Sequence, residues 1–91
     1  MNKHELILKI AAETGLPRKN VELGLLTALE LITQSLSEDE KVQLVGFGAF
    51  EPRHRGPRLG RNPKTGEPAD IPASRTVMFK PGRSLKEAME L

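Results

Sequence analysis

Residues 53–75, RHRGPRLGRNPKTGEPADIPASR, decide the fold of this chain. Glycines and prolines recur along the whole stretch, so no helix can run through it. Leu59 and Ile71 are its only large aliphatic residues, which leaves too little apolar area to form a core. It is not a linker, because only about 15 residues follow it. We therefore predict a protruding two-stranded ribbon with its tip at residues 62–66.

The flanking residues predict the body that holds this ribbon. A helix should begin at Lys3 behind an Asn2 cap and end at Gly15, and a second should run from Pro17 to about Ser37. Strands are expected over 41–45, from residue 49 onward and over 76–80. The prediction is an α+β fold: two N-terminal helices, a three-stranded antiparallel sheet extended into an arm, and a short C-terminal helix.

The expected organisation is one domain over residues 1–91. Its helical dimerisation part is 1–40, its sheet and arm 41–80 with the arm about 52–76, and its last helix 83–91. If the arm projects, only about two thirds of the chain remain to build a core. The second helix is apolar around more than half of its circumference, which favours a subunit interface. We therefore expect an obligate homodimer with no stable folded monomer.

Charge is distributed unevenly along the chain. Residues 52–86 hold nine basic and two acidic residues, a net +7, whereas residues 1–51 hold five basic and eight acidic residues, a net −3. A basic region of this kind favours a polyanionic partner. The remaining alternative is a solvated basic surface.

Other properties bear on the class of protein. The chain has no Cys, so disulfides and cysteine-based metal sites are not expected. No leader peptide or membrane-spanning run is recognisable, and a cytoplasmic location without membrane partners is expected by default.

Four motifs carry a resemblance to a known family. They are VGFGAF (45–50), GRNPKTG (60–66), DIPAS (70–74) and FKPG (79–82), in this order and with matching gaps. With the two-helix start, they resemble the bacterial histone-like DNA-binding proteins, HU and its relative integration host factor. The resemblance covers the whole chain. Proteins of this family bind the minor groove and bend DNA.

The resemblance implies a role for particular residues. Two identical chains would form an intertwined homodimer with one shared core. Their sheets would form a saddle-shaped surface under a duplex, and their two arms would reach around it. The implied DNA-binding residues are Lys3, Arg53, Arg55, Arg58, Arg61, Asn62, Pro63, Lys64, Arg75, Lys80, Arg83 and Lys86. The implied dimer core consists of Leu29, Ile32, Leu36, Leu44, Phe47, Phe50 and Phe79.

Pro63 is implied to be the wedge that enters between base pairs. It has a rigid ring and no amide hydrogen, so it leaves no donor unpaired there. The alternative is that Asn62-Pro63 only forms the hairpin turn. The ribbon departs from the common family pattern at Leu59, where a basic residue is frequent, and in its additional prolines, each of which removes one ladder hydrogen bond.

The expected function is sequence-independent binding and bending of double-stranded DNA in the nucleoid, with preference for bent, nicked or gapped duplex. A sequence-preferring protein like integration host factor is the nearest alternative. A helix-turn-helix regulator built on residues 3–36 and an RNA-binding structural protein are alternatives of other classes. No enzyme, cofactor or metal is expected, because His4 and His54 lie apart without a catalytic pattern and read as solvated.

Overall fold

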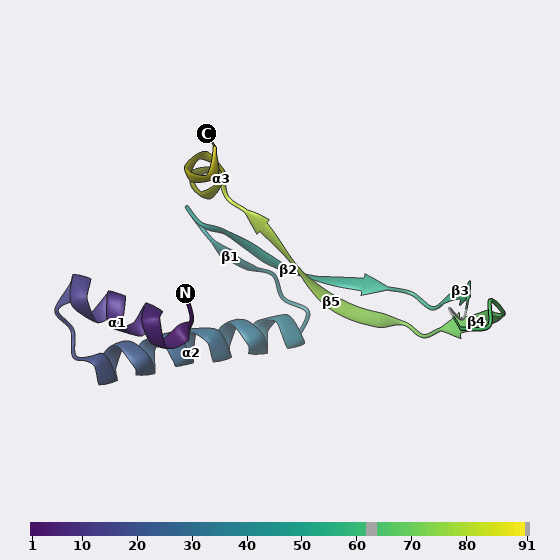
Figure 1. Cartoon of the computed structure of the whole chain (residues 1–91), viewed down its shortest axis with the longest axis horizontal. Helices are drawn as coiled ribbons and strands as arrows, with labels where there is room; N and C mark the ends of the chain where they lie inside the picture. Colours follow the sequence, from purple (N-terminus) through teal and green to yellow (C-terminus); the bar gives the residue numbers. More distant parts are fainter. Residues whose placement is uncertain (62–63, 91) are drawn as a thin grey trace. The chain divides into compact units, whose positions relative to one another are not determined.

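The computed structural model describes residues 1–61 and 64–90, without the side chains at 58, 69 and 71. In order, its elements are α1 (Lys3–Thr14), α2 (Arg18–Ser37), β1 (Val42–Leu44), β2 (Gly48–Arg55), β3 (Arg58–Arg61), β4 (Pro68–Ile71), β5 (Ser74–Pro81) and α3 (Arg83–Met89). This order confirms the predicted α+β fold (Figure 1). The chain divides into two compact units, Met1–Gln34 and Ser35–Leu91.

The first unit contains a helical hairpin (Figure 1). The Asn2 side chain accepts a hydrogen bond from the Glu5 amide at 2.8 Å, which caps α1 as predicted. Gly15 ends the helix in the left-handed conformation, at φ 72°. Ile7 of α1 and Val21 of α2 are both buried. The turn between the helices therefore brings one apolar residue of each into the interior of the unit.

The second unit contains a three-stranded antiparallel sheet with strand order β1-β2-β5. Gly46 takes φ 91° in the turn between β1 and β2, a conformation that favours glycine. A Cβ at Gly48 would lie 2.7 Å from the Lys80 carbonyl oxygen, so the strands approach too closely there for any side chain. The amide of Gly82 donates to the Phe47 carbonyl at 2.7 Å and ties the end of β5 to the turn.

The arm, residues 52–76, is a ribbon in two segments. Pairing of β2 with β5 ends at Arg55–Ser74, and pairing resumes at Arg58–Ile71 in a separate two-stranded sheet of β3 and β4. Pro57 and Pro72 lie in the interval, one on each side of the ribbon. Because proline has no amide hydrogen, the ladder cannot continue through these positions.

The last helix is shorter than the predicted range 83–91. Helix α3 ends at Met89, and Glu90 has an extended backbone at φ −73° and ψ 142°. The final residue of the predicted range, Leu91, lies outside the described residues.

Very little apolar surface is buried in the single chain. Among the described residues, the buried apolar side chains are Ile7, Val21 and Ala49. Large apolar side chains remain exposed on both units, including Leu23, Leu29, Leu31, Leu44, Val45, Phe47, Val77 and Phe79. In the part of the chain that the structure describes, no helix is long and apolar enough to cross a membrane.

Candidate nucleic-acid interface

The pairing of β2 with β5 separates two kinds of side chain. Successive residues of a strand point to opposite faces, and residues paired across two strands share a face. One face, here called the charged face, carries Glu51, Arg53 and Arg55 of β2 with Ser74, Thr76, Met78 and Lys80 of β5. The other, here called the aromatic face, carries Phe50, Pro52 and His54 with Arg75, Val77 and Phe79.

The aromatic face is an incomplete apolar cluster. Phe50 and Phe79 are paired across the two strands with their ring centroids 4.9 Å apart, and Phe47 lies 5.6 Å from Phe79. Such tilted ring pairs add to the stability of an apolar cluster. Phe47 is nevertheless 48% exposed and Val77 50% exposed. The apolar residues of this face are therefore partly exposed.

An ion-pair network lies at the centre of the charged face. The Glu51 carboxylate accepts from the Lys80 ammonium at 2.9 Å and from the Lys41 ammonium at 3.1 Å. Hydrogen bonds from Lys80 and then Lys41 lower the pKa of Glu51 below its usual value. Lys80, predicted to contact DNA, is thus already engaged within the protein.

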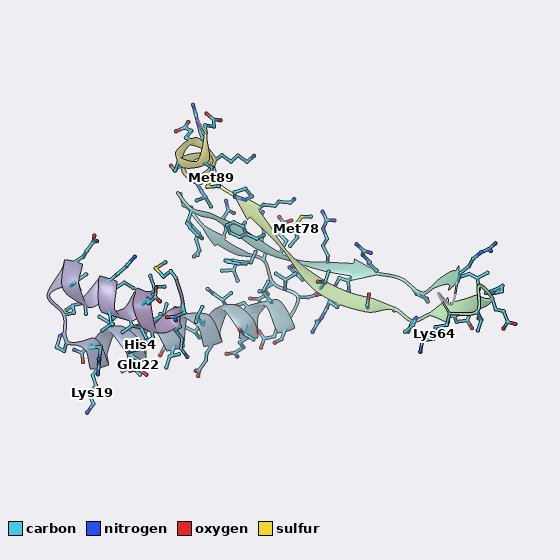
Figure 2. All side chains as sticks on the ribbon, in the orientation of Figure 1. His4, Lys19, Glu22, Lys64, Met78 and Met89 are labelled. Atoms are coloured by element: carbon cyan, nitrogen blue, oxygen red, sulfur yellow. The ribbon has the colours of Figure 1, made fainter. Side chains whose placement is uncertain are left out.

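Farther along the arm, three arginines have no carboxylate partner among the described residues. Arg53, Arg55 and Arg61 are exposed and make no ion pair among the residues that the structure describes. Lys64 is exposed on the arm beyond β3, away from the three-stranded sheet (Figure 2). Arg58 is placed in β3 by its backbone. Two further predicted residues, Asn62 and Pro63, lie outside the described residues.

Of the other predicted DNA-binding residues, Arg75 belongs to β5 and the remaining three belong to helices. Lys3 is exposed in the first turn of α1, in the first unit. Arg83 and Lys86 are exposed on α3, and the Arg83 guanidinium binds Glu87 at 3.0 Å one turn along the helix. Lys3 belongs to the first unit, whereas Arg83 and Lys86 belong to the same unit as the charged face.

A polar cluster at the base of the arm was not predicted. The His54 ring nitrogen Nε2 lies 2.7 Å from both carboxylate oxygens of Asp39. The Arg75 guanidinium donates to the Ser37 carbonyl at 2.9 Å and lies 3.8 Å from the same carboxylate. His54 was expected to be solvated; its side chain is 59% exposed, and it also has this carboxylate partner. Ser37, Asp39, His54 and Arg75 are here called the arm-base cluster. Two of them, His54 and Arg75, are brought together by the cross-strand pairing, which the sequence alone does not give.

Comparison with known proteins places this architecture. The family described as bacterial DNA-binding protein matches residues 1–90. The chain belongs to this family. A DNA-binding protein HU of Geobacillus stearothermophilus is 48% identical over 90 residues, covering 99% of this chain and all of that protein. The HU of Thermotoga maritima is also 48% identical over 90 residues, with the same shares.

Solved HU structures have the same fold as this member of the family. The HU of Anabaena in a cocrystal with DNA matches with a TM-score of 0.87 and 44% identity, over 97% of this chain and 96% of that one. The HU of Thermotoga maritima matches with a TM-score of 0.70 and 39% identity, over 99% of this chain and all of that one. The resemblance inferred from the four motifs is confirmed.

The Glu51 network has a measurable consequence. A carboxyl whose pKa is lowered in the folded state contributes stability that is present above its unfolded pKa and lost as the pH falls through the folded pKa. We expect Lys80→Met to raise the midpoint of the Glu51 titration toward its usual value, and Lys41→Met to raise it less, because the Lys80 hydrogen bond is the larger cause. Carboxyl ¹³C shifts followed against pH measure both midpoints. Equal midpoints in wild type and both variants would contradict the network.

Proposed function

We propose that this protein binds double-stranded DNA without sequence preference and bends it. The observation that carries the proposal is the charged face, on which exposed arginines follow a strand pair that continues outward as the arm. Cations spaced along a ribbon suit the phosphates of a duplex, which lie at regular intervals along its backbone. The HU of Anabaena, whose solved structure is similar to this one, was crystallised with DNA, which supports the same use here.

The proposed contacts fall into two groups. Arg53, Arg55, Arg58, Arg61 and Lys64 would follow the backbone and the minor groove along the arm. Lys80, Arg83, Lys86 and Lys3 would contact phosphates nearer the body. Lys80 and Arg83 must first leave Glu51 and Glu87, so each gains less from a phosphate than an arm arginine without an internal partner does.

At the tip, Pro63 is proposed to enter between base pairs, framed by Asn62 and Lys64. Its place in the sequence supports this role, because it lies between the ends of β3 and β4, where the ribbon reverses. Unstacking a base step costs a few kcal/mol, and bending a short site costs about 1 to 6 kcal/mol more. DNA that is already nicked, gapped or bent avoids part of this cost. The protein should therefore prefer such DNA.

Sequence preference is expected to be low. Arginine and proline presented to the minor groove meet a pattern of donors and acceptors that scarcely distinguishes the base pairs. A protein that behaved like integration host factor would show one preferred sequence. A protein whose target is RNA would be competed away by duplex RNA. The role is architectural rather than enzymatic, and we propose the bacterial nucleoid, within the cytoplasm, as its location.

We also propose that the folded unit is a homodimer. The aromatic face and the exposed apolar residues of α2, which are Leu23, Leu29 and Leu31, would supply the apolar surfaces that meet in a dimer. Leu29, Leu44, Phe47 and Phe79 are exposed, and Ile32, Leu36 and Phe50 are only half-buried, as expected of residues that meet a second copy. Because the arm contributes little to a core, the rest of the chain must form it, and a core of that size is marginal without a second copy.

Salt dependence tests DNA binding. We expect wild type to bind a linear 30-base-pair duplex with a steep decrease of log affinity against log salt, and Arg55→Gln to reduce that slope by about 0.9 for each phosphate contact removed. Lys19→Gln removes the same charge from α2 in the first unit, away from the arm sequence, and is the matched control (Figure 2). Equal slopes for the two variants would show that charge alone, and not the charged face, governs binding.

The wedge is tested with the same duplex carrying a nick. We expect wild type to prefer the nicked duplex and Pro63→Ala to lose most of that preference while keeping its salt slope, because the substitution removes no charge. Competition titrations at fixed salt measure the ratio of the two affinities. An unchanged ratio in Pro63→Ala would mean that Pro63 is a turn residue only.

Assembly is tested by thermal unfolding over a range of protein concentration. If dimerisation and folding are linked, the Tm should rise by about 3 to 5 °C for each tenfold increase in concentration. Sedimentation at the same concentrations gives the mass of the folded species. A Tm independent of concentration, with a monomer mass, would contradict the proposed homodimer.

A further inference from the structure

Arg75 lies on the face of the arm base opposite to the available arginines. It is paired with His54 across the ladder and shares the aromatic face, whereas Arg53 and Arg55 share the charged face. Its guanidinium is already bound to the Ser37 carbonyl and near the Asp39 carboxylate. Position and partners therefore both separate Arg75 from the residues that would meet phosphates.

Asp39 joins both strands of the arm to one turn. It contacts His54 of β2 and Arg75 of β5, and it lies just after the end of α2, within the same unit as the arm. The ladder ends at the pair Arg55–Ser74, and His54–Arg75 is the pair immediately before it. The arm-base cluster is thus placed to hold the ribbon immediately before its interruption.

The backbone of Asp39 has an unusual conformation. It has φ 67°, and among the described residues it is the one non-glycine residue with a positive φ. Aspartate tolerates this conformation better than most residues do, although glycine would adopt it at lower cost. A side chain is therefore kept at a position that suits glycine, and that side chain makes the contacts to the arm.

The contacts of the arm-base cluster are exposed and contribute little to the free energy of unfolding of the whole protein. The side chains of His54, Asp39 and Arg75 are 59%, 49% and 47% exposed, and ion pairs of this kind contribute little to global stability. A weak contact can still change the population of a local opening several-fold. Its effect is expected on the order of the arm base and not on the unfolding of the whole protein.

We propose that Asp39 is a positioning residue for DNA binding: through His54 and Arg75 it holds the base of the arm in the binding conformation, and Arg75 serves in this cluster instead of contacting phosphate. The inference rests on the proposed function. An arm base already ordered loses less conformational entropy when it binds, so affinity is higher.

Simple electrostatics predicts the opposite sign. Asp39 lies in an acidic turn with Glu38 and Glu40, beside an arm that would bind a polyanion. Removing a negative charge there should strengthen DNA binding if charge is all that matters. Weaker binding after removal of Asp39 would therefore identify positioning.

The variant to make is Asp39→Gly, which removes the carboxylate and suits the left-handed backbone, so the turn should fold as before. Glu38→Gln is the matched control, because it removes one negative charge next to Asp39 from a side chain with no ion pair among the described residues. Relative to Glu38→Gln, we expect Asp39→Gly to bind the nicked duplex about three- to tenfold more weakly, with its salt slope unchanged.

Arg75→Gln separates positioning from direct contact. We expect it to weaken binding as Asp39→Gly does without reducing the salt slope, and we expect the double variant to be no weaker than either single one. Amide ¹⁵N relaxation of residues 53–55 and 74–76 in the free protein should show increased motion in both variants. A slope reduced by about 0.9 in Arg75→Gln would instead assign it a phosphate contact.

The outcomes distinguish the two proposals. If wild type binds duplex with a steep salt slope but Asp39→Gly binds as tightly as Glu38→Gln, the positioning role is wrong and the proposed function stands. If wild type shows no salt-dependent binding to any duplex, the proposed function itself is wrong.

Discussion

The antiparallel register of β2 with β5 is the constraint on which the rest of the second unit depends. A shift by one residue would move every side chain of a strand to the other face, placing Phe50 among the lysines and Glu51 among the phenylalanines. Two close approaches hold the register: Gly48 admits the Lys80 carbonyl where a Cβ would collide, and the Gly82 amide binds the Phe47 carbonyl. Backbone packing at glycine thus determines which residues can face a ligand and which can face a second subunit.

The same register divides the cations of this unit into two groups, those with a carboxylate partner and those without one. Lys80 and Arg75 are held by carboxylates of the second unit, whereas Arg53 and Arg55 have no such partner among the described residues. An internal pair lowers what a cation gains by moving to a phosphate, because the first carboxylate must be left behind. Under the proposed function, the arm arginines would therefore contribute most of the affinity for DNA, whereas the cations with carboxylate partners stabilise contacts within the protein.

Much of the architecture could be predicted from local sequence. The Asn2 cap and the Gly15 stop are each decided by one or two residues and their backbone preferences, and the structure confirms both. Apolar alternation and turn residues predicted the order of the remaining elements. The polarity of the arm followed from composition, because a stretch with only Leu59 and Ile71 as large aliphatic residues cannot form a core.

What could not be predicted depends on which residues meet across the ladder. The prolines of the arm were evident, but whether Pro57 and Pro72 fall in the same interval is a matter of register, and only then does the ribbon separate into two segments. The engagement of Lys80 by Glu51 and the meeting of His54 and Arg75 at Asp39 also need the register, since these residues are far apart in sequence.

Dimerisation and the arm are linked through the small size of the core. Few apolar side chains are buried among the residues that the structure describes, so the proposed homodimer would draw its folding free energy largely from the second copy. Such a protein would have little stability to spare for an ordered projection. An arm ordered by its own core would need apolar residues that would then be exposed along a DNA-binding surface. Under the proposed positioning role, polar contacts at the base would order the first pairs of the ribbon without placing apolar residues along that surface.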